Sequence, residues 1–137
     1  MANLFALLDA TNTIINVTVG NETDLTTEQE MATHLGVDVS KVKRYSEDGT
    51  YLNRGEALIG GSYSISGNYF IPEQRFSSWT FNSETRDWDA PVPEPTDQKA
   101  THNIWWDEEN QKWMGVVEGG DGTELTWNPD TNTWENV

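Results

Sequence analysis

An eight-residue pattern recurs in the second half of this sequence and most constrains how the chain can fold. Its copies read FNSETRDW at 81–88, WDEENQKW at 106–113 and WNPDTNTW at 127–134. Each copy begins with an aromatic residue, continues with Asn or Asp, and ends with Trp. Residues 8–15, LDATNTII, follow the pattern more loosely, with aliphatic ends. Turn-forming residues between two strand-forming ends predict a β-hairpin with a loop of about four residues in each copy.

The pattern also predicts which residues face each other, because a four-residue loop sets the first residue of each copy opposite its last. The predicted pairs are Phe81–Trp88, Trp106–Trp113 and Trp127–Trp134, with Asp107 facing Lys112 in the middle copy. Cross-strand aromatic pairs contribute on the order of 0.5–1.5 kcal/mol beyond their burial. Asn132 suits the left-handed backbone that ends such a turn. Arg86, Gln111 and Thr13, which hold this position in the other copies, suit it less.

All seven Trp residues follow residue 78, so we predict two small modules, 1–75 and 76–137. The chain has a formal net charge of −15 at pH 7, and residues 79–137 carry 3 basic and 13 acidic side chains. The Pro-rich segment 89–98, DAPVPEPTDQ, should be extended and polyproline-like. The second module is therefore predicted to be a set of acidic, Trp-rich hairpins.

The first module is predicted to be β-rich with one helix. Its predicted elements are, in order, a hairpin over 3–19, a helix over 26–35, a strand over 41–46, a hairpin turn at Asp48-Gly49 that returns at 50–52, and short strands with loops over 55–71. The predicted fold class is mainly β with one short helix, in two small modules built from β-hairpins.

Composition argues against most chemical functions. The chain has no Cys, which excludes disulfides, cysteine nucleophiles and cysteine metal ligands. His34 and His102 lack a patterned partner, so we predict no catalytic, cofactor-binding or metal-binding residue. Asn128, Asp130 and Asn132 copy part of the spacing of a calcium loop, but the Gly and the distant Glu of that loop are absent.

The charge and the apolar pattern also argue against two classes of partner. A chain this acidic repels phosphate backbones, so we expect no nucleic-acid binding. No apolar run approaches the roughly 20 residues of a membrane-spanning helix, so we expect no membrane partner. The first twelve residues, MANLFALLDATN, lack a positively charged start and do not predict a signal peptide.

Three aromatic residues are candidates for a protein interface. Trp105 and Trp106 are adjacent, so in a strand they point to opposite faces. If Trp106 lies in the hairpin core, Trp105 needs a second layer or a partner. Phe76 and Trp79 precede the first copy of the pattern. We therefore predict Phe76, Trp79 and Trp105 as the interface residues.

Two alternative binding functions fit the same residues. An acidic Trp-rich β module can bind a host surface glycan, because indole faces stack on sugar rings and carboxylates accept hydrogen bonds from hydroxyls. Residues 127–135, WNPDTNTWE, look locally like the second hairpin of a peptide-binding WW domain. The Pro that usually follows the last Trp of a WW domain is absent from this chain.

The stretch YFIPEQRFSSWTFNSETRDWDAPVPEP at 69–95, with the later WWDEENQKW, resembles small virion structural proteins of tailed, marine cyanophage-type bacteriophages. The matching residues are Phe70, Ile71, Pro72, Phe76, Ser78, Trp79, Asn82, Thr85, Trp88, Ala90, Pro91, Val92, Pro93 and Pro95. The chain departs from the family at Arg86, where Cys is common, at Asp89 for Glu and at Glu94 for Tyr, and by a further Trp hairpin at 123–137.

The resemblance implies a particle component without enzymatic activity or cofactor. Its partners would be other virion proteins, with the protein present as a homo-oligomer or in multiple copies. Assembly would take place in the host cytoplasm. Attachment to the capsid shell or to a tail or neck appendage is expected, with capsid decoration preferred.

Overall fold

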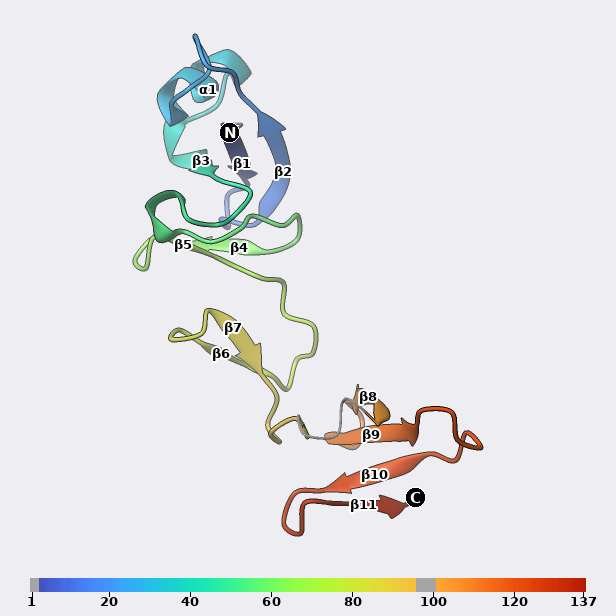
Figure 1. Cartoon of the computed structure of the whole chain (residues 1–137). Helices are drawn as coiled ribbons and strands as arrows, with labels where there is room; N and C mark the ends of the chain where they lie inside the picture. The colour runs from blue at the N-terminus through green and yellow to red at the C-terminus, as the bar shows by residue number, and fades with distance from the viewer. Residues whose placement is uncertain (1–2, 96–100) are drawn as a thin grey trace. The chain divides into compact units, whose positions relative to one another are not determined.

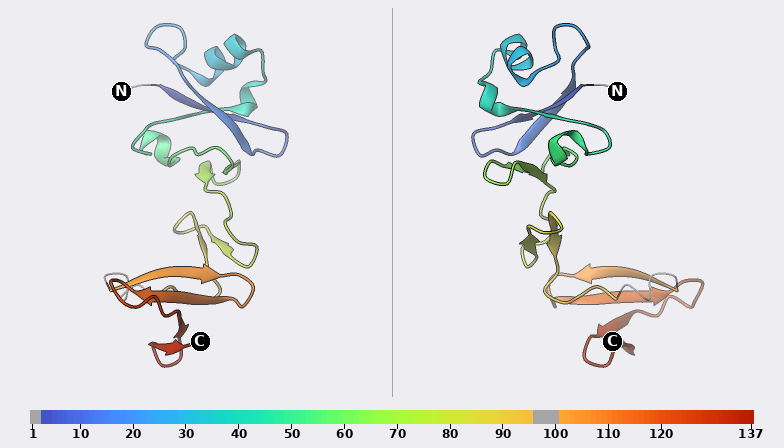
Figure 2. Two further views of the ribbon diagram at one scale, coloured as in Figure 1. Left: turned by 90° about the vertical axis from the view of Figure 1, so that its right-hand side faces the viewer. Right: turned by 60° about the vertical axis from the view of Figure 1, so that its left-hand side comes forward.

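The computed structural model describes residues 3–95 and 101–137 (Figures 1 and 2). The predicted fold class is confirmed, because the described residues are mainly β with one α-helix and small antiparallel sheets. The chain divides into two compact units, Met1–Gln74 with Ser83–Asp87, and Arg75–Asn82 with Trp88–Val137. No helix among the described residues is both long and apolar enough to cross a bilayer.

A three-stranded antiparallel sheet forms the centre of the first unit. Phe5 and Ala6 are neighbours on its middle strand, and both are 0% exposed, so this strand is covered on both faces. The predicted hairpin over 3–19 is confirmed by the pairing of the first two strands. The strands are β1 (Leu4–Leu8), β2 (Ile14–Val19) and β3 (Val42–Tyr45), in the order β2–β1–β3, and the 3-10 helix η1 (Val39–Lys41) leads into β3.

Helix α1 (Glu28–Leu35) covers one face of this sheet and confirms the predicted helix. The Thr27 hydroxyl accepts a hydrogen bond from the main-chain N of Glu30 at 3.1 Å, and the Glu30 carboxylate accepts one from the main-chain N of Thr27 at 3.1 Å. This capping box fixes where the helix begins. Gly36, with φ of 72°, ends it. The core beneath the helix consists of Phe5, Met31, Ala32 and Val42, with Leu25 at its edge.

A short hairpin of β4 (Ser62–Ser64) and β5 (Tyr69–Ile71) packs against the other face. Tyr63 and Phe70 face each other across this hairpin, with ring centroids 5.0 Å apart. In Figure 1 the hairpin lies on the side of the β1–β3 sheet away from α1. The core on this side consists of Ala6, Leu8, Ile14, Tyr45, Ala57, Tyr63 and Phe70.

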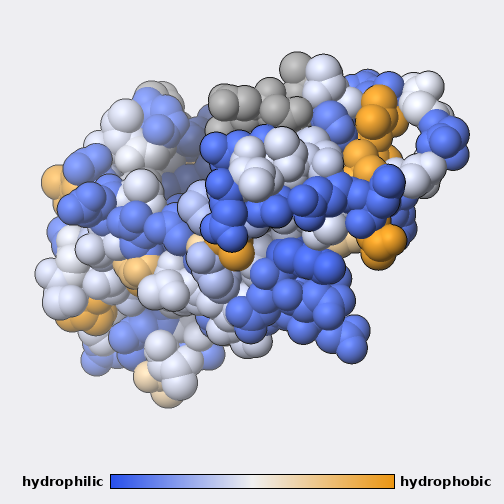
Figure 3. All heavy atoms as spheres, turned by 90° about the horizontal axis from the view of Figure 1, so that it is seen from below, coloured by the Kyte–Doolittle hydropathy of each residue, from blue (hydrophilic) through white to orange (hydrophobic). Residues whose placement is uncertain are grey.

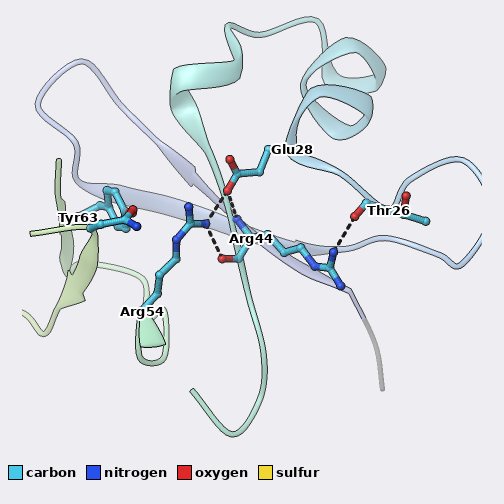
Figure 4. Close-up of polar contacts among 6 residues, drawn as sticks. Thr26, Glu28, Arg44, Arg54 and Tyr63 are labelled. Carbon is cyan, nitrogen blue, oxygen red and sulfur yellow. Dashed lines mark hydrogen bonds and ion pairs between the residues drawn. The ribbon is translucent and has the colours of Figure 1, made fainter. Parts of the chain in front are cut away.

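A charged network joins α1, β3 and the loop that follows β3 (Figure 4). The Oε2 atom of Glu28 accepts from the main-chain N of Arg44 at 2.8 Å and from Nη1 of Arg54 at 2.6 Å. The same Nη1 donates to the carbonyl of Arg44 at 2.9 Å. The guanidinium of Arg54 lies over the Tyr63 ring, 5.7 Å from its centroid. Arg54 is only 6% exposed, so Glu28 neutralises a cation that is shielded from water.

The predicted hairpin at Asp48-Gly49 is wrong, because the returning segment is the 3-10 helix η2 (Tyr51–Asn53) and not a strand. The charged network gives the physical reason. At Arg44 the outer edge of β3 is already occupied, since its N–H donates to Glu28 and its carbonyl accepts from Arg54. A returning strand finds these hydrogen-bonding positions taken, so the tertiary contact overrides the local turn signal.

The second unit is built from hairpins, which Figure 2 shows in yellow, orange and red. One four-stranded antiparallel sheet has the order β11–β10–β9–β8, and β6 pairs with β7 in a two-stranded ribbon. The strands are β6 (Thr80–Asn82), β7 (Asp87–Asp89), β8 (His102–Asp107), β9 (Lys112–Val117), β10 (Leu125–Asn128) and β11 (Thr133–Asn136).

Four hairpins of the chain share one geometry. In each, an aromatic ring packs edge-on against the ring seven positions later, and the last loop residue has a positive φ. The ring pairs are Tyr63–Phe70, Phe81–Trp88, Trp106–Trp113 and Trp127–Trp134, with centroids 5.0, 5.4, 5.1 and 5.2 Å apart and interplanar angles of 63°, 65°, 65° and 62°. The positive-φ residues are Asn68, Arg86, Gln111 and Asn132, at 60°, 58°, 49° and 54°. The predicted contacts in all three Trp copies are therefore confirmed, as is the pairing of Asp107 with Lys112.

The copy at 63–70, YSISGNYF, was not predicted from the sequence because its ends are Tyr and Phe. The looser copy at 8–15 is wrong in register. Leu8 pairs with Ile14, and a bulge leaves Ile15 unpaired and 55% exposed. Asn12, not Thr13, has the positive φ, at 65°. The main-chain N of Thr13 instead donates to the Asp9 carboxylate at 3.0 Å, which closes a shorter loop.

Replacing Glu28 by Ala should lower the free energy of unfolding of the first unit by about 3 kcal/mol, because the Arg54 cation would lose its carboxylate in a shielded site. Amide hydrogen exchange of β1 and β3 measures this loss. Glu22→Ala removes an exposed carboxylate of the same unit and should change the free energy by less than about 0.5 kcal/mol. Equal losses in the two variants would contradict the role of the network.

Replacing Gln111 by Gly should stabilise the second unit by about 1 kcal/mol, because the left-handed backbone disfavours residues with a Cβ by about 1–2 kcal/mol. Urea unfolding followed by Trp fluorescence reads this unit alone, since all seven Trp lie within it. Asn132→Gly, at the matching position of the next hairpin, should have a smaller effect because Asn tolerates this conformation. A loss of stability in Gln111→Gly would be inconsistent with the shared hairpin geometry.

Candidate binding surfaces of the Trp-rich unit

An aromatic cluster forms the core of the second unit. The Trp79 ring lies 5.2 Å from that of Phe76, 6.1 Å from that of Trp106 and 6.0 Å from that of Trp113, measured between centroids. Trp106 and Trp113 are each 6% exposed. Of the three predicted interface residues, Trp79 contacts three rings of this cluster and Phe76 contacts Trp79. Their contact with a partner protein stays a prediction.

Glu108 connects the segment before β6 to the β8–β9 hairpin. Its Oε2 atom accepts from the Ser77 hydroxyl at 2.9 Å and from the main-chain N of Ser78 at 3.0 Å. Its Oε1 atom accepts from the Ser78 hydroxyl and from Nε1 of Trp106 at 2.9 Å. These hydrogen bonds, the one from the Ser78 hydroxyl first, favour the ionised form and lower the pKa of Glu108 to about 2. No local spacing predicts this contact, because 30 residues separate Ser78 from Glu108.

A groove of about 410 Å³ borders the aromatic cluster. It is lined by Trp79, Trp88, Asp89, Ala90, Pro91, Val92, Pro93, Glu94 and Trp113. Nε1 of Trp113 donates to the carbonyl of Val92 at 2.8 Å and so ties the Pro-rich segment to the cluster. Residues 91–95 of this segment form neither helix nor strand, and residues 96–98 lie outside the described residues. The segment was predicted from the sequence, but the groove beside it was not.

Trp105 lies on the face of the β8–β11 sheet that is opposite the aromatic cluster. Strand register places it opposite Met114, while Trp106 faces Trp113 in the cluster, so the prediction that the adjacent indoles face opposite sides is confirmed. Trp105 is 39% exposed. Val116, next on the same side of β9, is half-buried. We call Trp105, Met114 and Val116 the Trp105 face.

Trp134 of β11 reaches back across the sheet. Its ring stacks on that of His102 in β8, with centroids 5.0 Å apart and an interplanar angle of 15°. A Cβ atom at Gly115 would lie 2.8 Å from the indole, so only Gly leaves room for this crossing. His102, which the sequence left without a partner, is therefore a packing residue that helps to join the two hairpins of this sheet.

The remaining polar side chains of the hairpins mostly hold turns. Among the described residues, no group of three or more acidic or His side chains is placed to bind a metal ion. In the turn at 128–132, Asn128 Oδ1 accepts from the main-chain N of Asp130 at 3.0 Å, and Asn128 Nδ2 donates to Glu135 at 3.1 Å. On the face drawn in Figure 3, hydrophobic residues form small separate groups among hydrophilic ones.

Replacing Glu108 by Gln should destabilise the second unit in a pH-dependent way. Because the pKa of Glu108 is lowered from 4.5 to about 2 on folding, its ionised form stabilises the fold fully above pH 4.5, and this contribution is lost as the pH falls toward 2. The urea midpoint of Glu108→Gln should therefore lie below that of the wild type at pH 7, and the two should converge near about pH 2. Glu109→Gln, the neighbouring exposed residue, should leave the midpoint unchanged at both pH values. A gap for Glu108→Gln that persists at low pH would exclude the ionised carboxylate as its cause.

No protein-family model, curated protein or solved structure matches this chain. Its function must therefore be inferred from its own residues and geometry. The two features that bear most directly on function are the Trp105 face and the groove beside the aromatic cluster.

Proposed function

We propose that this protein is a non-enzymatic structural component of a tailed-bacteriophage virion. In this role it attaches in multiple copies to the capsid shell or to a tail or neck appendage, and capsid decoration is the preferred role. The Trp105 face is the observation that carries the attachment. The resemblance of residues 69–95 to small virion proteins supports the identity of the particle.

The Trp105 face has the composition of a protein-binding surface. Its exposed centre is the indole of Trp105, which lies next to the buried Met114, and Trp is enriched at interfaces. Strand pairing continues from Met114 to Thr126 and then to Glu135, so the apolar centre has a polar border on the same face. An apolar centre with a polar rim is the usual organisation of a specific interface.

The rigidity of the Trp105 face favours tight attachment. Trp105 lies on β8, which is paired along its length with β9, and Trp106 anchors the same strand in the aromatic cluster. An indole held on a paired strand loses little conformational entropy when a partner covers it. Single Trp residues of this kind commonly dominate the binding energy of an interface.

The net charge of −15 suits a protein that remains soluble before it assembles. Like charges oppose association of free copies, so a partner surface is needed to bring many copies together. A complementary partner would also guide the approach and would make its rate depend on ionic strength.

Quantitative mass spectrometry of purified virions tests the proposed location. A copy number close to the number of capsomers supports capsid decoration, whereas a handful of copies supports a tail or neck position. Absence of the protein from purified particles would overturn the proposal.

Replacing Trp105 by Ala should weaken binding to particles that lack this protein by at least about 30-fold, as expected for a Trp at the centre of an interface. Co-sedimentation with such particles measures the loss, and Trp fluorescence verifies the fold. Trp127→Phe is the matched control, because it alters an indole on the opposite face and retains the aromatic pair with Trp134. Unchanged co-sedimentation of Trp105→Ala would remove the Trp105 face as the attachment surface.

A further inference from the structure

The groove beside the aromatic cluster combines aromatic rings with negative charge. Three of its lining residues are indoles and two are carboxylates, and no Lys, Arg or His is among the described residues that line it. The face of an indole carries a negative potential that attracts cations. Rings and carboxylates that line one groove therefore favour a positively charged occupant over a neutral or anionic one.

The carboxylates of Asp89 and Glu94 give the groove charged hydrogen-bond acceptors. Pro91 and Pro93 have no main-chain N–H, and the indole N–H of Trp113 is already donated to the carbonyl of Val92. Asp89 accepts a hydrogen bond from Nδ2 of Asn82 at 2.9 Å through Oδ2, and a carboxylate can accept bonds at both oxygens. A cation that donates hydrogen bonds to these carboxylates is therefore a complementary ligand.

The first unit shows how this chain accommodates such a group. The guanidinium of Arg54 lies 5.7 Å from the ring centroids of Tyr51 and Tyr63, and the carboxylate of Glu28 neutralises it. Arg44 lies over the Tyr51 ring at 4.5 Å. Aromatic rings and a carboxylate thus surround a cation inside this fold. The groove supplies the same two kinds of group at the surface of the second unit.

We infer that the groove binds the cationic side chain of an Arg or Lys residue from a segment of a partner protein. The planar guanidinium of Arg fits best, because it can stack on an indole and donate two parallel hydrogen bonds to a carboxylate. This inference rests on the proposed function only in taking a protein as the partner. The binding site itself is separate from the Trp105 face, since the two sets of residues do not overlap.

Titration of the full-length, ¹⁵N-labelled protein with synthetic peptides tests the inference. The probe peptide is Ac-Gly-Arg-Gly-Arg-Gly-amide, and its control carries citrulline, an uncharged analogue of Arg, at both Arg positions. The indole N–H signals of Trp79, Trp88 and Trp113 should shift, whereas those of Trp105 and Trp127 should not. The citrulline peptide should bind at least about fivefold more weakly, and binding of the Arg peptide should weaken as NaCl rises from about 50 to about 500 mM.

Two variants assign the binding to the groove. Asp89→Asn and Glu94→Gln together should weaken binding of the Arg peptide by at least about tenfold, because they remove both carboxylates. Glu118→Gln with Glu124→Gln removes two exposed carboxylates outside the groove and should change binding less than about twofold. The indole spectra show whether each variant is folded. Equal binding of the Arg and citrulline peptides, or unchanged binding by the groove variant, would overturn the inference.

Two further titrations test whether the groove binds a sugar instead and whether the Trp105 face contributes to peptide binding. Titration with the trimer of N-acetylglucosamine should leave the three groove indoles unshifted. Shifts of these signals by the sugar, without a response to the Arg peptide, would assign the groove to carbohydrate and refute the inference. Trp105→Ala should bind the Arg peptide as the wild type does. Particle attachment therefore tests the proposed function, and peptide binding tests the groove inference. Either one can fail while the other holds.

Discussion

The edge-to-face contact between two aromatic rings organises this protein. A two-stranded hairpin is marginally stable by itself in water, yet four hairpins here repeat one loop length and one ring geometry, with interplanar angles from 62° to 65°. The ring pair fixes which residues face each other, and the left-handed residue at the end of each loop fixes where the chain turns. In the second unit Trp79 contacts both rings of the Trp106–Trp113 pair, and Phe76 packs on Trp79, so these four rings form a shared core.

In the first unit a charged network holds the elements together. Helix, strand and loop meet at Glu28, which binds the main chain of Arg44 and the side chain of Arg54. The network also blocks the outer edge of β3, so it shapes the fold as well as stabilising it. A chain without Cys cannot use disulfides, and its first unit combines this polar anchor with the ring contact of Tyr63 and Phe70. Glu108 brings a polar anchor into the second unit, where it binds both Ser78 and Trp106.

The sequence revealed the hairpins because their determinants are local. Trp at fixed spacing and an Asn such as Asn132 at the end of a turn are visible without any knowledge of the fold. The copy at 63–70 escaped because Tyr and Phe serve there in place of Trp. The burial of Arg54, the contact of Glu108 with Ser78 and the groove depend on residues far apart in the chain, so no local spacing could predict them. The turn at Asp48-Gly49 forms, but the strand predicted after it does not, because a distant carboxylate competes for the edge of β3.

The constant construction of the hairpins has a consequence for how such a chain can change in evolution. Each ribbon supplies both rings of its own pair and is one repeating unit of the chain, while β9 and β10 also pair across the boundary between two units. Copying or deleting one such unit would change the width of a sheet by two strands and would keep the pairing register within each remaining hairpin. The two hairpins of the four-stranded sheet must fit each other at Gly115, where the indole of Trp134 crosses to His102. The chain should therefore gain or lose length in whole hairpins, and selection should act most strongly on the residues where two hairpins contact each other.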